Sequence, residues 1–263
     1  MTLQAPTAQR IRESTAPATP LGTALRSSGS GIGQSNEEAS GPRGAPVWNA
    51  IWSRRGAVTS TVDLIRQFLH RLHRRVLEPH CGPTTELLEL GCGPASLTLS
   101  LTPRIQRLVG MDISEEALRQ ARAAQVRLGA TNAEFVLGDC RALPFSEAFD
   151  VVWSAGLIEH FFERDIDVVL QHMNALRPGG IALTSVPAKY SLHWLHYRLT
   201  RPRALRWLWP WSAEPAFQTF YTPRSLRELG QRTGYAPRVR YLPPAWLGWF
   251  LGILLLEIRK PRP

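Results

Sequence analysis

In this chain of 263 residues, three short segments combine glycines or carboxylates with a preceding apolar run, a pattern suited to ligand binding. In residues 86–95, the apolar run leads to Glu89, and Gly91 and Gly93 follow. Glycines at such a turn let a ligand approach the bare backbone, because no Cβ atom stands in the way. A phosphate-binding turn would place an anion on the helix N-terminus. A carboxylate just before the turn instead suits a ligand that carries positive charge.

A second carboxylate ends residues 107–112, which we expect to form a short buried strand. Asp112 lies about 20 positions after the first glycine, where an acidic side chain can accept both ribose hydroxyls of an adenine nucleoside. Ile113 is then placed to lie against the adenine ring. Ser114 is predicted as the N-cap of a helix that ends near Gly129.

Three further segments continue this strand-and-turn pattern. Residues 135–145 begin as a strand and reach Gly138 and Asp139. Residues 149–155 are rich in valine, as fully buried parallel strands are. Pro178 and Gly179 are expected to end a helix, and a fifth strand then runs to residue 184.

Taken in order, these segments resemble the class I S-adenosylmethionine-dependent methyltransferases, and among them the small-molecule enzymes of type 11. The family's first motif is an acidic residue followed by Gly-x-Gly-x-Gly, and Ala95 replaces the third glycine here. The resemblance covers residues 86–187. It implies an α/β fold with a Rossmann-like, seven-stranded, mostly parallel sheet, helices on both faces and an antiparallel last strand.

The resemblance also implies S-adenosylmethionine as the cofactor, whose sulfonium and ammonium suit the carboxylate before the turn. In the family, the aspartate after the third strand accepts from the adenine amino group, and the end of the fourth strand faces the methyl donor. The predicted cofactor-binding residues are Glu89, Gly91, Cys92, Gly93, Asp112, Ile113, Asp139, Cys140 and Ser154.

A general base is needed in methyl transfer only when the acceptor is protonated. His160, just beyond the fourth strand, is the first candidate, followed by His193 and His196. No metal site is expected, because the three cysteines show neither a CxxC pair nor a Cys/His ligand spacing.

Residues 1–45 are rich in Ser, Thr, Ala, Gly and Pro, and we expect a disordered N-terminal extension. This leaves 46–263 as the methyltransferase domain. Residues 61–78 fit an amphipathic helix, and Trp48, Trp52 or Arg55 can help to close the cofactor pocket.

Residues 188–220 are expected to form a variable lid over the acceptor, because 190–211 mix aromatic side chains with arginines. After the lid, Thr222 and Pro223 are predicted to start a helix. Residues 237–242 and 252–258 then form the final antiparallel pair. The apolar run 245–256 is too short to span a bilayer and is interpreted as a buried last strand. Peripheral contact of 190–211 or 245–256 with a membrane stays open.

The sequence therefore favours methyl transfer to a small, lipophilic or aromatic acceptor, because ligand pockets are mostly apolar. An RNA or protein acceptor is the first alternative: the net charge is +10, and the basic excess lies outside residues 81–186. Against nucleic acid as a partner, the fourth strand lacks the Asn/Asp-Pro-Pro-aromatic signature for a flipped base. A non-catalytic S-adenosylmethionine-binding protein remains a second alternative.

A nucleotide-dependent oxidoreductase is disfavoured, because its fingerprint requires glycine where this chain has Ser96. Few, unpatterned cysteines suit a reducing compartment, so a cytoplasmic protein is expected, with membrane association left open. The sequence does not indicate the oligomeric state.

Overall fold

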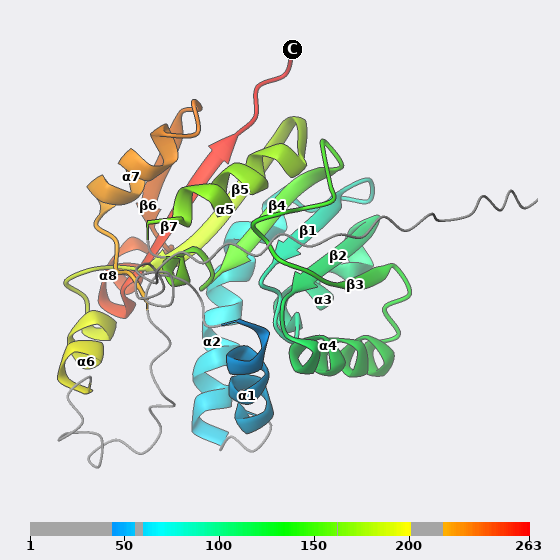
Figure 1. The fold of residues 1–263 in the computed structure, drawn as a ribbon, viewed down its shortest axis with the longest axis horizontal. Helices are drawn as coiled ribbons and strands as arrows, with labels where there is room; N and C mark the ends of the chain where they lie inside the picture. The colour runs from blue at the N-terminus through cyan, green and yellow to red at the C-terminus, as the bar shows by residue number, and fades with distance from the viewer. Residues whose placement is uncertain (1–43, 56–59, 162, 201–217) are drawn as a thin grey trace, which may run out of the picture. The chain divides into compact units, whose positions relative to one another are not determined.

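A seven-stranded sheet forms the centre of the computed structural model, which describes residues 44–55, 60–161, 163–200 and 218–263 (Figure 1). Most of the predicted N-terminal extension and residues 201–217 of the predicted lid lie outside the described residues. The strands, in chain order, are β1 Glu86–Leu90, β2 Arg107–Asp112, β3 Ala133–Leu137, β4 Phe149–Ala155, β5 Leu176–Pro187, β6 Pro237–Tyr241 and β7 Ile253–Arg259.

The strand order is β3-β2-β1-β4-β5-β7-β6. All neighbouring pairs from β3 to β5 are parallel, and β7 runs antiparallel to both β5 and β6. The predicted fold class is therefore confirmed, including the antiparallel last strand. The order reverses at β1, which lies between β2 and β4, and ligands bind at the carboxyl ends of strands at such a switch point.

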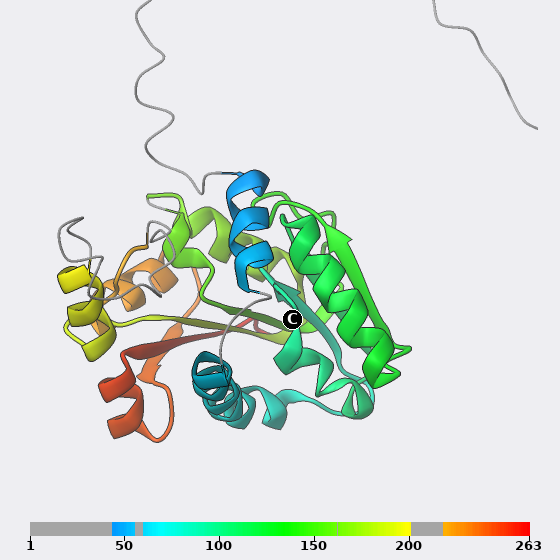
Figure 2. The ribbon, with the colours of Figure 1, turned by 90° about the horizontal axis from the view of Figure 1, so that it is seen from below.

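Helices cover both faces of the sheet (Figure 2). The described helices are α1 Ala45–Arg55, α2 Ser60–Leu77, α3 Ser96–Leu99, α4 Glu115–Leu128, α5 Asp165–Ala175, α6 Leu192–Thr200, α7 Pro223–Gln231 and α8 Ala245–Leu251, with short 3-10 turns η1 Glu78–His80, η2 Thr102–Arg104 and η3 Ile158–His160.

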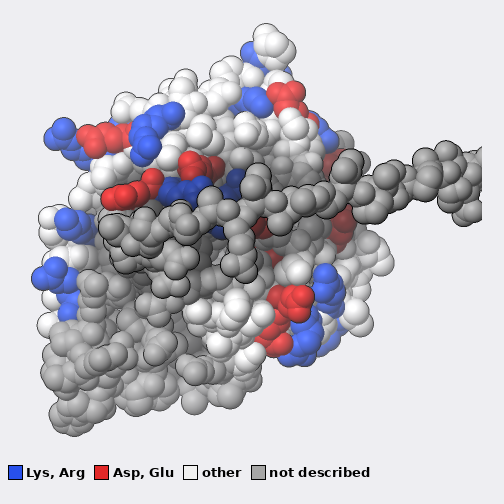
Figure 3. All heavy atoms as spheres, in the orientation of Figure 1, with Lys and Arg blue, Asp and Glu red and all other residues white. Residues whose placement is uncertain are grey.

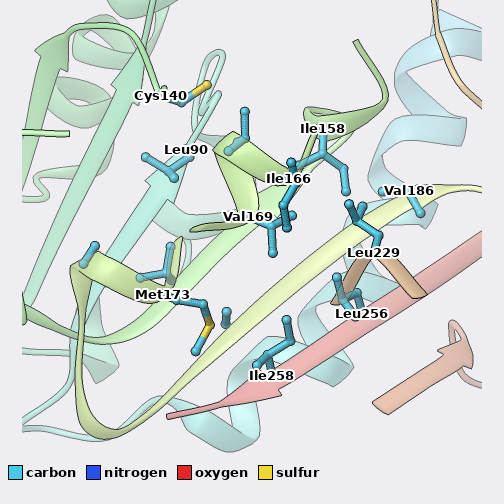
Figure 4. Packing of buried hydrophobic residues seen from close by; sticks show 14 of the residues in the cluster. Leu90, Cys140, Ile158, Ile166, Val169, Met173, Val186, Leu229, Leu256 and Ile258 are labelled. Carbon is cyan, nitrogen blue, oxygen red and sulfur yellow. The ribbon is translucent and has the colours of Figure 1, made fainter. Parts of the chain in front are cut away.

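Alternating side chains of β1 enter two different cores, because successive residues of a strand point to opposite faces. Leu88 and Leu90 pack with α5 and α7 (Figure 4). Leu87 packs instead with Leu72 and Val76 of α2. Buried on both faces, β1 holds its carboxyl end, and hence Glu89, in a rigid position.

Several predicted helix ends are present. The Ser114 hydroxyl accepts from the backbone N–H of Ala117, and Gly129 ends α4 in a left-handed conformation. Thr222 caps α7 and accepts from the N–H of Ser225, with proline at the helix start.

The helix after the glycine turn spans Ser96–Leu99, and the 3-10 turn η2 follows within a few residues. One prediction about a helix end is wrong in extent. The helix before Pro178 already ends at Ala175. Pro178 and Gly179 lie instead at the start of β5, beside an irregularity in its pairing with β4.

The interpretation of 245–256 as one buried strand is also wrong. Residues 245–251 form the helix α8, and Gly252, with φ +73°, ends it in the left-handed region. The strand β7 begins only at Ile253. A continuous apolar run fits a strand or a helix equally well, and pairing with β5 needs only the second half of this run. No helix of the described ranges is long and apolar enough to cross a membrane.

Candidate active site

A cavity of about 710 Å³ opens at the carboxyl ends of β1, β2 and β4. Pockets for small ligands usually measure about 300–1,000 Å³, so a cofactor and a small acceptor are within its range. All the predicted site residues line this cavity except Ser154. The fold therefore brings together side chains that are up to about 70 positions apart in the chain, from Glu89 to His160.

The two glycines of the turn after β1 are both required by the backbone. Gly91 has φ +63° and Gly93 has φ +51°, a region that L-residues rarely adopt. A Cβ atom at Gly93 would lie 2.6 Å from Cζ2 of Trp52. Ala95, the third position of the motif, is also left-handed at φ +51°, and its side chain is buried. The turn is therefore kept bare on the side of the cavity.

Helix α1 covers this turn. The side-chain oxygen of Asn49 accepts from the Ser114 hydroxyl at 2.7 Å and from the backbone N–H of Glu116 at 3.2 Å. These bonds tie α1 to the start of α4. Trp48 and Trp52 consequently line the cavity, as expected, whereas the side chain of Arg55 lies outside the described residues.

Glu89, the next-to-last residue of the central strand β1, has a buried carboxyl group. The Thr98 hydroxyl donates to its Oε2 at 2.5 Å. Burial raises the pKa of Glu89 to about 8, the Thr98 hydrogen bond opposes this rise, and the nearby Asp112 charge adds to it. A cationic group brought into the cavity would favour the ionised form, so the site suits a positively charged ligand.

Asp112 connects β2 with the glycine turn. Its Oδ2 accepts from the backbone N–H of Gly93 at 2.8 Å, and its Oδ1 accepts from that of Ser114 at 2.9 Å. Burial raises its pKa, although both N–H groups act in the opposite direction. Each carboxylate oxygen has a further lone pair, so Asp112 retains capacity for the hydroxyls of a ribose.

Asp139 is engaged by Arg141 of its own loop. The Arg141 Nε donates to Oδ1 at 3.0 Å, and its guanidinium also reaches Oδ2. These bonds lower the pKa of Asp139, which remains partly exposed to the cavity. A ligand amino group that contacts Asp139 must therefore share the carboxylate with Arg141.

Cys92 and Cys140 line the cavity but are buried. Burial raises the pKa of the Cys140 thiol to about 12 and that of Cys92 well above its usual value. Both thiols are therefore neutral and unsuited to act as nucleophiles.

Ser154 does not reach the cavity. Its hydroxyl is fully buried and lies 2.9 Å from His172 Nε2 and 3.3 Å from Thr184 Oγ1, on the α5 side of the sheet. Ala155 and Gly156 line the cavity in its place. Side chains alternate along a strand, and the sequence did not reveal which face of β4 carries Ser154. We therefore omit Ser154 from the proposed site.

His160 stands on η3, directly after β4. Ile158, its neighbour in that turn, is buried among Ile166 and Val169 of α5 and Val186 of β5 (Figure 4). The His160 ring meets Trp48 edge-on, with ring centroids 4.9 Å apart. His193, His196 and Tyr197 of α6 also line the cavity, so all three candidate bases line the same cavity.

The comparisons with known proteins agree with this geometry. A family model described as "Methyltransferase domain" matches residues 87–180. A malonyl-[acyl-carrier protein] O-methyltransferase of Pseudescherichia vulneris is 28% identical over 58% of this chain and 67% of its own length. A trans-aconitate 2-methyltransferase of Azoarcus sp. is 30% identical over 40% of each chain.

Residues 87–180 are a methyltransferase domain, and the fold is that of the class I S-adenosylmethionine-dependent enzymes. The chain spans less than half the length of the trans-aconitate enzyme it matches. The fold matches the structure titled "DhpI-SAH complex" with a TM-score of 0.59 and 20% identity over 82% of this chain and 95% of that one.

The residues of this methyltransferase fit the family's cofactor, S-adenosylmethionine. The glycine turn at Gly91 and Gly93 lines the cavity, so a ligand can approach its backbone. Beside it lie two buried carboxyl groups, Glu89 and Asp112, with acceptor capacity for an ammonium and for ribose hydroxyls. The donor and acceptor set thus matches a cationic nucleoside.

Sequence analysis missed Glu159, which also lines the cavity. Its carboxyl group is buried, and Oε2 has no hydrogen-bonding partner among the described residues. Burial raises the pKa of Glu159 to about 8. The available signal was a carboxylate within the apolar stretch that precedes His160. This group can bond to a polar atom of a ligand.

His73 of α2 is a second residue that sequence analysis missed. Its Nε2 lies 2.8 Å from the Ser185 hydroxyl, and its ring meets Trp153 edge-on. Burial lowers the pKa of His73 to about 4, and His70 adds to the effect, so the ring is neutral at neutral pH. His70 and His73 are three residues apart, a spacing that places both on one face of a helix. This spacing was the available signal in the sequence.

Proposed function

We propose that this methyltransferase transfers the methyl group of S-adenosylmethionine to a small, lipophilic or aromatic acceptor. The observation that carries the proposal is one cavity lined by two unlike sets of residues. One set is the glycine turn with its carboxylates, which we call the cofactor half. The other set includes His160, His196 and Tyr197, with Trp48 beside His160, and we call it the acceptor half. The name of one relative gives trans-aconitate, a small molecule, as the acceptor, which supports a small-molecule substrate.

The proposed cofactor-binding residues are Glu89, Gly91, Cys92, Gly93, Asp112, Ile113, Asp139 and Cys140. When bound, the cofactor supplies an electrophilic methyl group on a sulfonium. We assign the ammonium to the Glu89 carboxylate, the ribose hydroxyls to Asp112 and the adenine to Ile113 and Asp139. Trp48 and Trp52 cover the bound cofactor and exclude water from it, which strengthens the electrostatic contacts between the protein and the cofactor.

On the acceptor side, we propose that His160 removes the proton of a hydroxylated acceptor. A neutral imidazole can accept a proton from a hydroxyl group. The ring contact with Trp48 fixes its orientation. We further propose that residues 46–263 form the methyltransferase domain and that 188–220 act as the lid over the acceptor.

The surface charges support a small acceptor rather than nucleic acid. On the face shown in Figure 3, basic side chains of the described residues are interspersed with acidic ones. Arginines of the described surface pair with close neighbours in the sequence, as in Arg119–Glu116 and Arg224–Glu228. A phosphate-binding surface instead gathers basic residues into a patch or stripe.

Calorimetry of S-adenosylmethionine and S-adenosylhomocysteine, with the wild type and Asp112→Ala, tests the cofactor half. We expect micromolar binding that the substitution weakens by about 1–3 kcal/mol, the cost of unpaired buried polar groups. Release of S-adenosylhomocysteine is then measured with a panel of quinols and phenols beside total RNA. Turnover with RNA alone would contradict the proposed acceptor class.

A further inference from the structure

Two helices beside the cavity expose large apolar side chains to solvent. We call this surface the apolar rim, and its residues are Leu192, Leu195 and Leu199 of α6 with Trp246, Trp249 and Phe250 of α8. Trp246 is 70% exposed, which is unusual for the largest side chain. Clustered apolar side chains of this kind mark a surface that contacts another molecule or a membrane.

Helix α6 exposes its leucines. Leu192, Leu195 and Leu199 are 46–56% exposed and do not line the cavity. His193 and His196, also exposed, and the half-buried Tyr197 are the α6 residues that line it. A surface helix normally turns its leucines toward the core and its polar side chains toward water. The arrangement of α6 is favourable where the outer face meets an apolar medium and the inner face meets a polar ligand site.

The two helices form one continuous surface. The backbone N–H of Ala188 donates to the carbonyl of Gly252 at 2.7 Å, which joins the start of α6 to the end of α8. A Cβ atom at Gly252 would lie 2.1 Å from the Ser191 hydroxyl oxygen. Gly248 packs equally closely on the backbone of Leu242 and so fixes which face of α8 is exposed. Figures 1 and 2 both place α6 and α8 at the same end of the sheet.

The charges beside the apolar rim are basic. Neither α6 nor α8 contains an acidic residue. Lys189 precedes α6 and Arg198 belongs to it, and both side chains are exposed. Lys189 Nζ lies 5.1 Å from the centroid of the Tyr190 ring, and the Arg198 guanidinium lies 5.5 Å from the centroid of the Trp194 ring. Lysine and arginine beside tryptophan, phenylalanine and leucine are typical of surfaces that lie in the headgroup region of an anionic membrane.

We propose that the apolar rim binds the surface of an anionic lipid bilayer. The exposed aromatic side chains of α8 and the leucines of α6 enter the headgroup region, while Lys189 and Arg198 contact lipid phosphates. In this orientation the inner face of α6 borders the cavity, so a lipophilic acceptor can pass from the bilayer into it. This last step rests on the proposed function, whereas binding to the bilayer does not.

Co-sedimentation of the full chain with lipid vesicles tests the proposal. The probes are vesicles of phosphatidylcholine alone and of phosphatidylcholine mixed with phosphatidylglycerol. We expect binding to the anionic vesicles that Trp246→Ser/Trp249→Ser/Phe250→Ser weakens at least about tenfold, because three large apolar side chains are lost. Lys189→Gln/Arg198→Gln should weaken it by about tenfold on anionic vesicles and little on neutral ones.

The matched control is Val126→Ser/Leu128→Ser, which replaces two exposed apolar side chains of α4, away from the rim. It should bind vesicles like the wild type. Calorimetry with S-adenosylmethionine tests whether each variant is folded. We expect an affinity within about twofold of the wild type, which is a small change in the free energy of binding.

Vesicle binding that is absent, or equal in the wild type and the α8 variant, would overturn the proposal. A concentration-dependent dimer in solution that the α8 variant abolishes would also overturn it, by assigning the rim to a second copy. If the chain binds vesicles through the rim but not S-adenosylmethionine, the proposed function fails while the membrane surface stands.

Discussion

The two halves of the cavity are constructed in different ways. In the cofactor half, Asp112 holds Gly93 and Ser114 through its two oxygens, so side chains and backbone from neighbouring strand ends fix one another. In the acceptor half, His160 and Glu159 share the cavity with residues of α1 and α6, such as Trp48 and Tyr197. The cofactor half is thus centred on neighbouring strand ends, whereas the acceptor half also needs the helices α1 and α6, which lie far apart in the chain.

The largest expected effect separates the two halves. His160→Gln should lower kcat for a hydroxylated acceptor by about 100-fold, because a positioned base contributes about that much or more. S-adenosylmethionine affinity should stay within about twofold. Turnover and calorimetry on the same sample test this prediction, and an equal loss of cofactor affinity would place His160 in the cofactor half.

The glycine turn is the next test. Gly93→Ala should weaken S-adenosylmethionine binding more than about tenfold, because the new Cβ atom displaces Trp52 and strains a left-handed residue. The control is Gly129→Ala, which has a similar φ of +62° and open space around it. It should cost about 1 kcal/mol of stability with unchanged affinity. Similar affinities of Gly93→Ala and Gly129→Ala for S-adenosylmethionine would show that the close packing of Gly93 against Trp52 is unimportant for binding.

The pH dependence of stability should reveal the buried acid of the acceptor half. Burial raises the pKa of Glu159 to about 8 from an ordinary value of 4.5. A raised folded-state pKa stabilises the protein at low pH, and this contribution is lost as the pH rises through about 8. Between pH 4.5 and about pH 8, Glu159 lowers the free energy of unfolding by at most about 1.4 kcal/mol per pH unit.

Glu159→Gln should reduce this dependence and leave S-adenosylmethionine affinity unchanged. A part remains in the variant, because the pKa of Glu89 is also raised to about 8. The free energy of unfolding of the wild type and of the variant is measured by urea unfolding at a series of pH values. Parallel curves for the wild type and the variant would mean that Glu159 is already ionised in the folded chain.

The smallest effect concerns the cofactor half. Glu89 also has its pKa raised to about 8, so it is mostly protonated in the free protein at pH 6. Cofactor binding should favour its ionised form, and affinity should therefore rise about threefold to tenfold between pH 6 and 8. Glu89→Gln should bind more weakly, with a flatter pH profile by calorimetry. An unchanged profile would show that Glu89 does not pair with the ammonium.

The first five strands, the glycine turn and the helix caps were predictable from the sequence for a local reason. A strand such as β1, its carboxylate and its turn are encoded within about ten residues, where apolar runs, glycines and caps have direct conformational meaning. The same reasoning failed where a local pattern fits two structures. The run 245–256 became α8 followed by β7, and Ser154 faces α5 rather than the cavity.

By itself, therefore, the sequence determined the family fold and the residues around the turn at Gly91 and Gly93. Only the tertiary structure decided that a buried Glu159 oxygen has no hydrogen-bonding partner among the described residues, that His73 pairs with Ser185 and that the leucines of α6 are exposed. The physical reason is that burial and orientation depend on which distant segment packs against a side chain. Neither residue type nor spacing encodes that neighbour directly.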